Sequence, residues 1–176
     1  MARDGGGEGG GLTESAFNLD VAERLRDELE ARGAEVVLTR DDDEGVGPCL
    51  DERARLADQV GADVLLSFHA HGDDAETSGF HVTSSPLAGE GSDVLATDVR
   101  DGLVAEDLVP SEVEGTDGLD VRRDLGTLNL SSVPAVIVDA RNLRSPVDQE
   151  VLGSPSGRQR IADGMADGTE AFLRGV

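Results

Sequence analysis

The sequence predicts an α/β protein built on a single, twisted, mostly parallel or mixed β-sheet with helices on both of its faces. Apolar runs of strand length alternate along the chain with segments whose apolar residues recur at helical spacing. These strands are apolar at consecutive positions, which is typical of parallel sheets buried under helices on both sides. A length of 176 residues is enough for one domain with a sizeable core.

The helices are predicted from apolar residues spaced three or four positions apart. Before the first helix, residues 1–11 are glycine-rich, and we expect a flexible lead-in there, with the folded domain covering 12–176. Gly33 is placed to end the first helix. The expected helices cover residues 14–32, 52–60, 90–106 and 157–173.

The strands are predicted from short apolar runs with turn residues on either side. We expect them at residues 34–39, 63–69, 79–85 and 134–140. In sheets of this kind, functional sites form at the carboxyl ends of the strands. His69 ends the second run and Asp139 lies near the end of the fourth, so both should lie at the functional edge.

Composition excludes several classes of partner. The 15 basic residues are all Arg, and with 37 acidic residues the net charge is −22. Such a surface repels nucleic acid and anionic membrane faces, so we expect neither as a partner. The chain has no apolar run of membrane-spanning length and a single cysteine, which excludes a cysteine-rich zinc site.

Four positions attract attention for their chemistry. Asp139 ends an apolar run, where a carboxylate is costly unless it is paired or functional. His69 at a strand end suits a zinc ligand or a hydrogen-bonded rim histidine. Glu14 at a helix start is favoured by the helix dipole in any case. His71 lies in the same strand-end loop as His69 and is a candidate for a supporting group that hydrogen-bonds a site residue.

Other candidates have weaker signals. His81 alternates with Phe80 and Val82, so it faces either the site or solvent on the opposite side from them. Arg122 and Arg123 are a basic pair on an acidic protein, suited to ion pairing or to binding a substrate carboxylate.

Together these segments resemble the zinc-dependent N-acetylmuramoyl-L-alanine amidases of the amidase 3 type, and the actinobacterial version in particular. The resemblance runs in order from about residue 12 to 173. The matching pieces are ESAFNLDVAERLRDELEARGAEVVLTR, GVGPCLDERA, ADVLLSFHAHG, GFHV, GLDVRRDLGTLNLSSVPAVIVDARNLRS and GRQRIADGMADGTEAFL.

The resemblance implies a twisted mixed sheet between helices and one Zn²⁺ ion. It implies hydrolysis of the amide that joins the lactyl group of N-acetylmuramic acid to L-alanine of the peptidoglycan stem peptide. Glu14 and His69 fall on two family zinc ligands, and Asp139 falls on the catalytic glutamate. Zinc polarises the scissile carbonyl, and a carboxylate carries the proton from water to the leaving amine. Arg122 or Arg123 is the candidate for holding a stem-peptide carboxylate.

Two departures from the family pattern bear on activity. The family's first histidine ligand and the strand before it have no counterpart upstream of Glu14, so we expect either a chain that starts late or a degenerate site. Asp139 is one methylene shorter than the family's glutamate. A misplacement of about 1 Å can slow a reaction by about 100-fold.

The leading hypothesis is therefore a peptidoglycan amidase that works outside the cell or in the cell wall, although the visible start carries no secretion signal. One alternative is an inactive amidase-like module that binds muropeptides or regulates another protein. Another is a hydrolase acting on a different acyl-amino-acid amide. The sequence gives no indication of oligomeric state.

Overall fold

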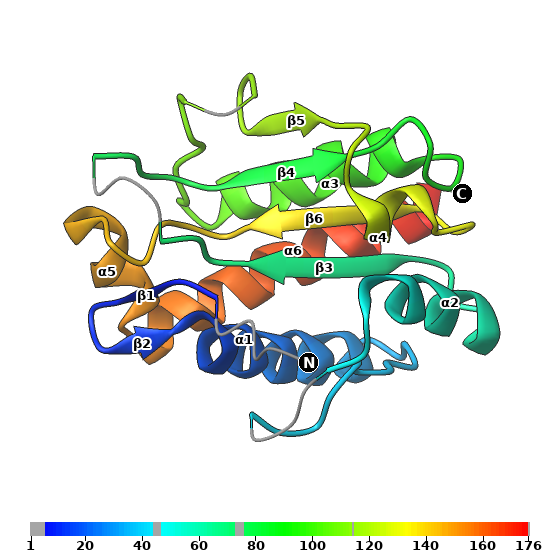
Figure 1. Ribbon diagram of the computed structural model, residues 1–176, viewed down its shortest axis with the longest axis horizontal. Coiled ribbons are helices and arrows are strands. Elements are labelled where there is room, and N and C mark those ends of the chain that lie inside the picture. Colours follow the sequence, from blue (N-terminus) through cyan, green and yellow to red (C-terminus); the bar gives the residue numbers. More distant parts are fainter. Residues whose placement is uncertain (1–5, 44–46, 73–75, 114, 176) are drawn as a thin grey trace.

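A computed structural model describes residues 6–43, 47–72, 76–113 and 115–175. Its centre is a four-stranded sheet with the strand order β3-β6-β4-β5 (Figure 1). β3 is parallel to β6, β4 is parallel to β5, and the two pairs meet in an antiparallel contact between β4 and β6. The strands are β3 (Leu65–His69), β4 (His81–Ser84), β5 (Leu119–Val121) and β6 (Ala135–Asp139).

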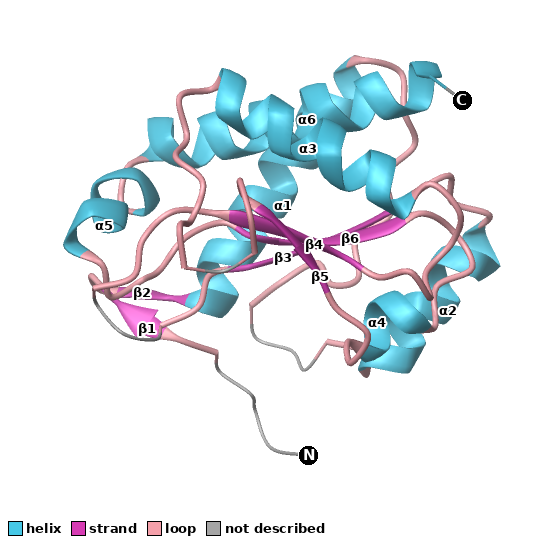
Figure 2. Ribbon diagram, turned by 90° about the horizontal axis from the view of Figure 1, so that it is seen from above, coloured by secondary structure: helices cyan, strands magenta, loops and turns pink. Residues whose placement is uncertain are grey.

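Helices cover both faces of this sheet, as predicted. Figure 2 shows three long helices on one side, and α2 and α4 on the other. The three are α1 (Glu14–Ala31), α3 (Ser92–Ala105) and α6 (Pro155–Gly175). The remaining helices are α2 (Leu50–Val60), α4 (Gly126–Asn129) and α5 (Pro146–Leu152). No helix within the described ranges is long and apolar enough to cross a membrane.

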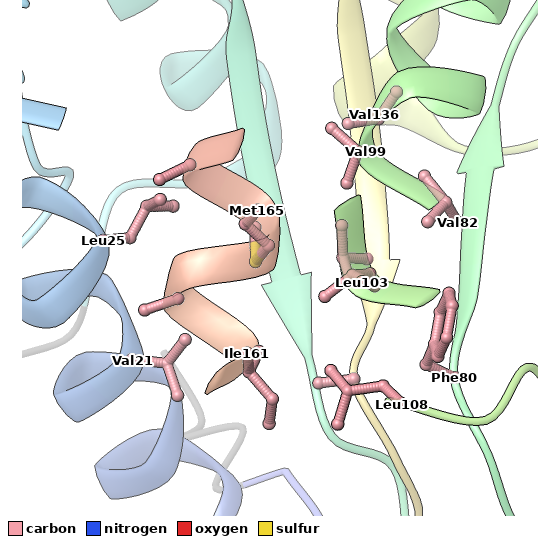
Figure 3. Close-up of a cluster of buried hydrophobic side chains, with 14 of the residues drawn as sticks. Val21, Leu25, Phe80, Val82, Val99, Leu103, Leu108, Val136, Ile161 and Met165 are labelled. Carbon is pink, nitrogen blue, oxygen red and sulfur yellow. The ribbon is translucent and has the colours of Figure 1, made fainter. Parts of the chain in front are cut away.

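The core lies between the sheet and the three long helices. Val21 and Leu25 of α1 and Ile161 and Met165 of α6 belong to the same buried apolar cluster as Val82 of β4 (Figure 3). The spacing of four that predicted the first helix is the spacing of its buried residues. Burial of these apolar side chains is the main source of stability, at roughly 25 cal/mol for each Å² removed from water.

α3 and α6 cross at unusually close range because glycines line the contact. A Cβ atom added to Gly102 of α3 would lie 2.1 Å from the carbonyl oxygen of Gly164 in α6. One added to Gly168 would lie 2.4 Å from the carbonyl oxygen of Asp98. The two backbones can approach this closely only because side chains are missing at these positions.

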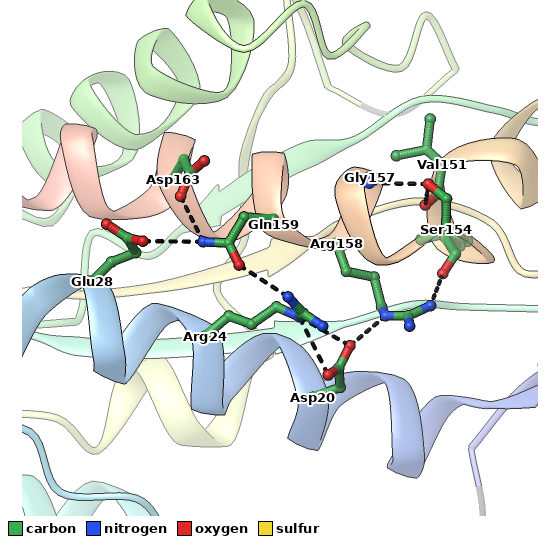
Figure 4. Close-up of polar contacts among 10 residues, drawn as sticks. Asp20, Arg24, Glu28, Val151, Ser154, Gly157, Arg158, Gln159 and Asp163 are labelled. Atoms are coloured by element: carbon green, nitrogen blue, oxygen red, sulfur yellow. Dashed lines mark hydrogen bonds and ion pairs between the residues drawn. The ribbon is translucent and has the colours of Figure 1, made fainter.

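Polar side chains join α1 to α6 where both helices reach the surface (Figure 4). Arg24 donates to the side chain of Gln159 at 3.0 Å, and Gln159 donates to Glu28 at 3.1 Å. Asp20 accepts from both Arg24 and Arg158, one from each helix. These bonds orient the two helices, while the apolar cluster beneath them supplies most of the stabilisation.

One prediction about the sheet was wrong, the strand at residues 34–39. Residues 34–39 form an extended loop, and Val37 is 50% exposed. A β-branched run becomes a strand only where another strand satisfies its backbone, and no strand among the described residues pairs with it. β4 runs against β6, so the sheet is mixed, as the family resemblance implied. The long connection between β4 and β6 allows either direction, so strand composition does not determine it.

The expected flexible lead-in spans residues 1–11, of which residues 1–5 lie outside the described ranges. β1 (Glu8–Gly9) and β2 (Leu12–Thr13) form a small antiparallel hairpin. The hairpin lies beside the ends of β3 and β6, on the same side of the molecule as α5 (Figure 1). Positive φ angles at Gly10 (58°) and Gly11 (80°) form its turn, which explains the glycines there.

Candidate active site at the ends of β3 and β6

Three polar residues lie side by side across three neighbouring strands. His69 ends β3 and pairs in register with Asp139, which ends β6. His81 begins β4 and pairs in register with Asp139 from the other side. The expectation that His69 and Asp139 meet at the carboxyl ends of their strands is therefore confirmed.

These three side chains share the face of the sheet that lies away from the core. Residues alternate between faces along a strand, and Phe68, Val82 and Val138 belong to the apolar cluster under the long helices. Their neighbours His69, His81 and Asp139 therefore point to the other face. This settles the ambiguity over His81, which faces the site.

Asp139 is held by a histidine on each carboxylate oxygen. Nδ1 of His71 lies 3.2 Å from Oδ1, and Nε2 of His81 lies 3.2 Å from Oδ2. A carboxylate can only accept, so each ring nitrogen donates. Burial on its own raises the pKa of Asp139, but the hydrogen bonds from His71 and His81 outweigh it and bring the pKa far below its usual range. Asp139 is therefore ionised at neutral pH.

Glu14 and His69 form a second pair next to the first. Thr13 caps α1 by accepting a hydrogen bond from the Ala16 amide, which places Glu14 in the first turn of the helix. Oε1 of Glu14 lies 2.8 Å from Nδ1 of His69, and Oε2 accepts from the Gly7 amide at 2.9 Å.

This pairing shifts both groups toward their charged forms. The hydrogen bond to Glu14 raises the pKa of His69, against the opposing effect of burial. Burial alone raises the pKa of Glu14, but the hydrogen bonds from His69 and Gly7 lower it further than burial raises it. The contact joins the start of α1 to the end of β3.

Glycines of the N-terminal hairpin segment allow the backbone to approach this site. A Cβ atom on Gly6 would lie 2.1 Å from Oε2 of Glu14. One on Gly7 would lie 2.8 Å from the amide nitrogen of Gly72, just after His71. The glycine-rich composition, which looked like that of a flexible lead-in, therefore permits tight packing against Glu14.

The described residues bring together two side chains of the types that can bind zinc. Glu14 and His69 converge, but no group of three or more His, Cys, Asp or Glu side chains within the described ranges could hold a metal ion. His71, the candidate supporting group, contacts Asp139. Catalytic zinc normally has three protein ligands and a water. These residues alone therefore do not make a complete zinc site.

The predicted arginine pair is not brought to this site. β5 runs antiparallel to β6, so the two strands end at opposite ends of the sheet (Figure 1). Asp139 ends β6, whereas Arg122 and Arg123 follow the end of β5. Arg122 donates to both carboxylate oxygens of Asp124, at 3.0 and 2.8 Å. The carbonyl oxygen of Arg123 accepts from the Asn129 side chain. Arg122 therefore forms a local ion pair with Asp124.

The sequence analysis did not single out Asp148, a buried carboxylate that joins two loops next to the strands of the site. Asp148 of α5 is fully buried and accepts from Arg141 at 2.6 Å, from the Asn142 amide at 3.1 Å and from the Gly79 amide at 3.1 Å. It thereby ties the loop after β6 to the segment that leads into β4. No periodic pattern marks Asp148, because its partners come from two distant segments.

Comparisons with known proteins agree with this arrangement. The family model described as N-acetylmuramoyl-L-alanine amidase matches residues 2–171. An N-acetylmuramoyl-L-alanine amidase of Mycobacterium tuberculosis is 37% identical over 169 residues, which cover 93% of this chain and 70% of that protein. Two solved N-acetylmuramoyl-L-alanine amidases also superpose closely on this fold. The amidase of Mycobacterium smegmatis has a TM-score of 0.93 at 34% identity, covering 97% of this chain and 82% of that one. The amidase of Clostridium difficile 630 has a TM-score of 0.86 at 25% identity, covering 98% and 91%.

The fold is therefore that of the solved amidases, a mixed sheet between helices. The chain belongs to the N-acetylmuramoyl-L-alanine amidase family, whose members are hydrolases of cell-wall peptidoglycan. The fold and the family inferred from the sequence are both confirmed. The family is generally zinc-dependent.

Proposed function

We propose that this chain hydrolyses the amide between the lactyl group of N-acetylmuramic acid and L-alanine of the stem peptide, with the edge formed by β3 and β6 as its active site. The observation that carries the proposal is the alignment of His69 and Asp139 on adjacent strand ends, within a chain that belongs to an amidase family. The site of action that follows is the cell wall, outside the membrane.

Asp139 is the group proposed to move the proton. It is ionised at neutral pH, and its side chain is 20% exposed, so solvent and substrate can reach it. Each carboxylate oxygen has a second lone pair besides the one used by a histidine. The carboxylate takes a proton from the attacking water and delivers it to the amide nitrogen as the carbon–nitrogen bond breaks. General acid–base catalysis of this kind typically contributes about 100- to 10,000-fold.

We propose Glu14 and His69 as two of the donors to a zinc ion. Their facing atoms, Oε1 and Nδ1, are of the types that zinc binds in hydrolases. Elemental analysis of the purified chain after zinc titration tests this assignment. Bound zinc should fall when His69 is changed to Ala, and should be unchanged when the exposed Asp27 is changed to Ala. Equal zinc in the wild type and in the His69→Ala variant would contradict the assignment.

The bond cleaved is tested by product analysis. Purified peptidoglycan is incubated with the chain, and the soluble products are identified by mass spectrometry. The proposal predicts stem peptides with a free L-alanine amino group and glycan strands that carry free lactyl carboxylates. Products cut within the glycan or within the stem peptide, or no soluble product at all, would overturn it.

A further inference from the structure

Asp139 has a partner in the sheet whose role the proposed reaction does not yet include. His81 is the first residue of β4, is 5% exposed, and lies in register with Asp139 on the antiparallel neighbour strand. Its Nε2 lies 3.2 Å from Oδ2 of Asp139. The contact is therefore made between two strands of one ladder and does not depend on a loop.

The two histidines on Asp139 differ in how firmly they are held. His71 lies in the segment after β3 and contacts Oδ1 with a side chain that is 23% exposed. The segment around His81 is fixed on both sides, since the Phe80 amide donates to Val109 and the Val82 amide donates to Gly118. Groups carried on strands are held more precisely than groups carried on loops. His81 is thus held more firmly than His71, and its hydrogen bond fixes the Asp139 carboxylate more precisely.

Precision matters here because an aspartate must reach the reacting atoms. A carboxylate can turn about its terminal bond, and displacement of a catalytic group by about 1 Å can slow a reaction by about 100-fold. A hydrogen bond from a buried ring on the adjacent strand fixes the direction in which Oδ2 points. That in turn fixes the remaining lone pairs for the water and the leaving amine.

We propose that His81 is a positioning residue, which donates its Nε2–H to Oδ2 of Asp139 and thereby orients that carboxylate for proton transfer. The inference rests on the proposed role of Asp139 as the proton-transferring group. It predicts that the effect of His81 on the rate passes through Asp139 and not through the binding of substrate.

The test is a mutant cycle measured on a soluble muropeptide. His81→Leu removes the donor and should lower kcat by about 10- to 100-fold with KM unchanged. His81→Gln keeps an N–H at a similar reach and should retain most of the wild-type kcat. Asp139→Ala should lower kcat further, and adding His81→Leu to it should lower kcat no more, because residues that act as a unit are not additive.

The outcomes separate this inference from the proposed function. A His81→Leu variant with wild-type kcat beside an inactive Asp139→Ala variant would overturn the positioning role alone. Losses that multiply in the double variant would also overturn it. A wild-type chain without turnover, or an Asp139→Ala variant with full activity, would overturn the proposed function and this inference with it. If His81→Leu does not fold, His81→Met replaces it, since methionine is about as long as glutamine and has no hydrogen to donate. Equal kcat for His81→Gln and His81→Met would then overturn the role.

Discussion

Different interactions stabilise the two faces of the sheet: apolar packing on one, and hydrogen bonds between charged and polar groups on the other. We call the face covered by the three long helices the helical face. There, apolar residues of α1, α3 and α6 pack against alternate residues of the strands, and glycines set the distance between α3 and α6. On the other face, at the edge where β3 and β6 end, charged and polar groups are held in pairs: Glu14 with His69, and Asp139 with His71 and His81. Strand β6 serves both, since Val138 enters the core and Asp139 enters the site.

The difference shows how stability and function are separated within a few residues. The helical face is stabilised by area removed from water, a contribution spread over many side chains. At the polar edge, each group depends on one or two partners, and loss of a partner leaves a charge buried and unpaired. Single substitutions should therefore have larger and more localised effects at the polar edge.

The largest effect on stability is expected at Asp148. Asp148→Ala leaves Arg141, itself buried, without its ion-pair partner and also removes the acceptor of two backbone amides. We expect the free energy of unfolding to fall by about 3–5 kcal/mol, measured by urea denaturation. Asp27→Ala, which removes an exposed partner of Arg26, is the matched control and should change it by less than about 0.5 kcal/mol. Equal effects at the two positions would remove the distinction between a buried and an exposed pair.

A smaller effect is expected on the helical face, at Gly168. Gly168→Ala places a methyl group against the backbone of α3 and should lower the free energy of unfolding by about 1–3 kcal/mol. In a helix without this contact, the same change would stabilise by about 0.5–1 kcal/mol. Gly175, in the last turn of α6, has nothing within 4 Å of its added Cβ and is the control. Thermal unfolding of the two variants compares them, and a neutral Gly168→Ala would show that α3 and α6 can separate without cost.

The smallest effect is expected for the partly exposed Asp20 between α1 and α6. Burial raises its pKa, but hydrogen bonds from Arg24 and Arg158 lower it below the ordinary value. A lowered pKa means that the stabilisation is present at neutral pH and is lost as the pH falls through that lowered pKa. Asp20→Asn should therefore reduce stability at neutral pH by less than about 1 kcal/mol, with the difference shrinking in acid. A difference that grew as the pH fell would contradict this sign.

What the sequence predicted follows the same division. The apolar spacing in α1 and α6, and the apolar run before Asp139, led directly to the buried elements of the helical face. The wrong strand at 34–39 and the missed strand β5 both concern pairing, which depends on neighbours that local composition does not specify. β5 is only three residues long, so it has too little pattern to stand out.

At the site, strand ends led to His69 and Asp139, and the family resemblance added Glu14. The contacts among them depend on register between distant segments. That is why the sequence left open whether His81 faces the site or solvent, and why Arg122 and Arg123 were assigned to a site that the fold does not bring them to. The buried Asp148 had no local signal at all.

The most direct test of the active-site assignment is the rate of muramoyl–L-alanine amide hydrolysis for the wild type, Asp139→Asn and Asp98→Asn. The last two make the same chemical change, at the site edge and on α3 of the helical face. We predict that Asp139→Asn slows hydrolysis by at least about 100-fold while the variant stays folded. Asp98→Asn should hydrolyse the amide at the wild-type rate. An Asp139→Asn variant as active as the wild type would contradict the account.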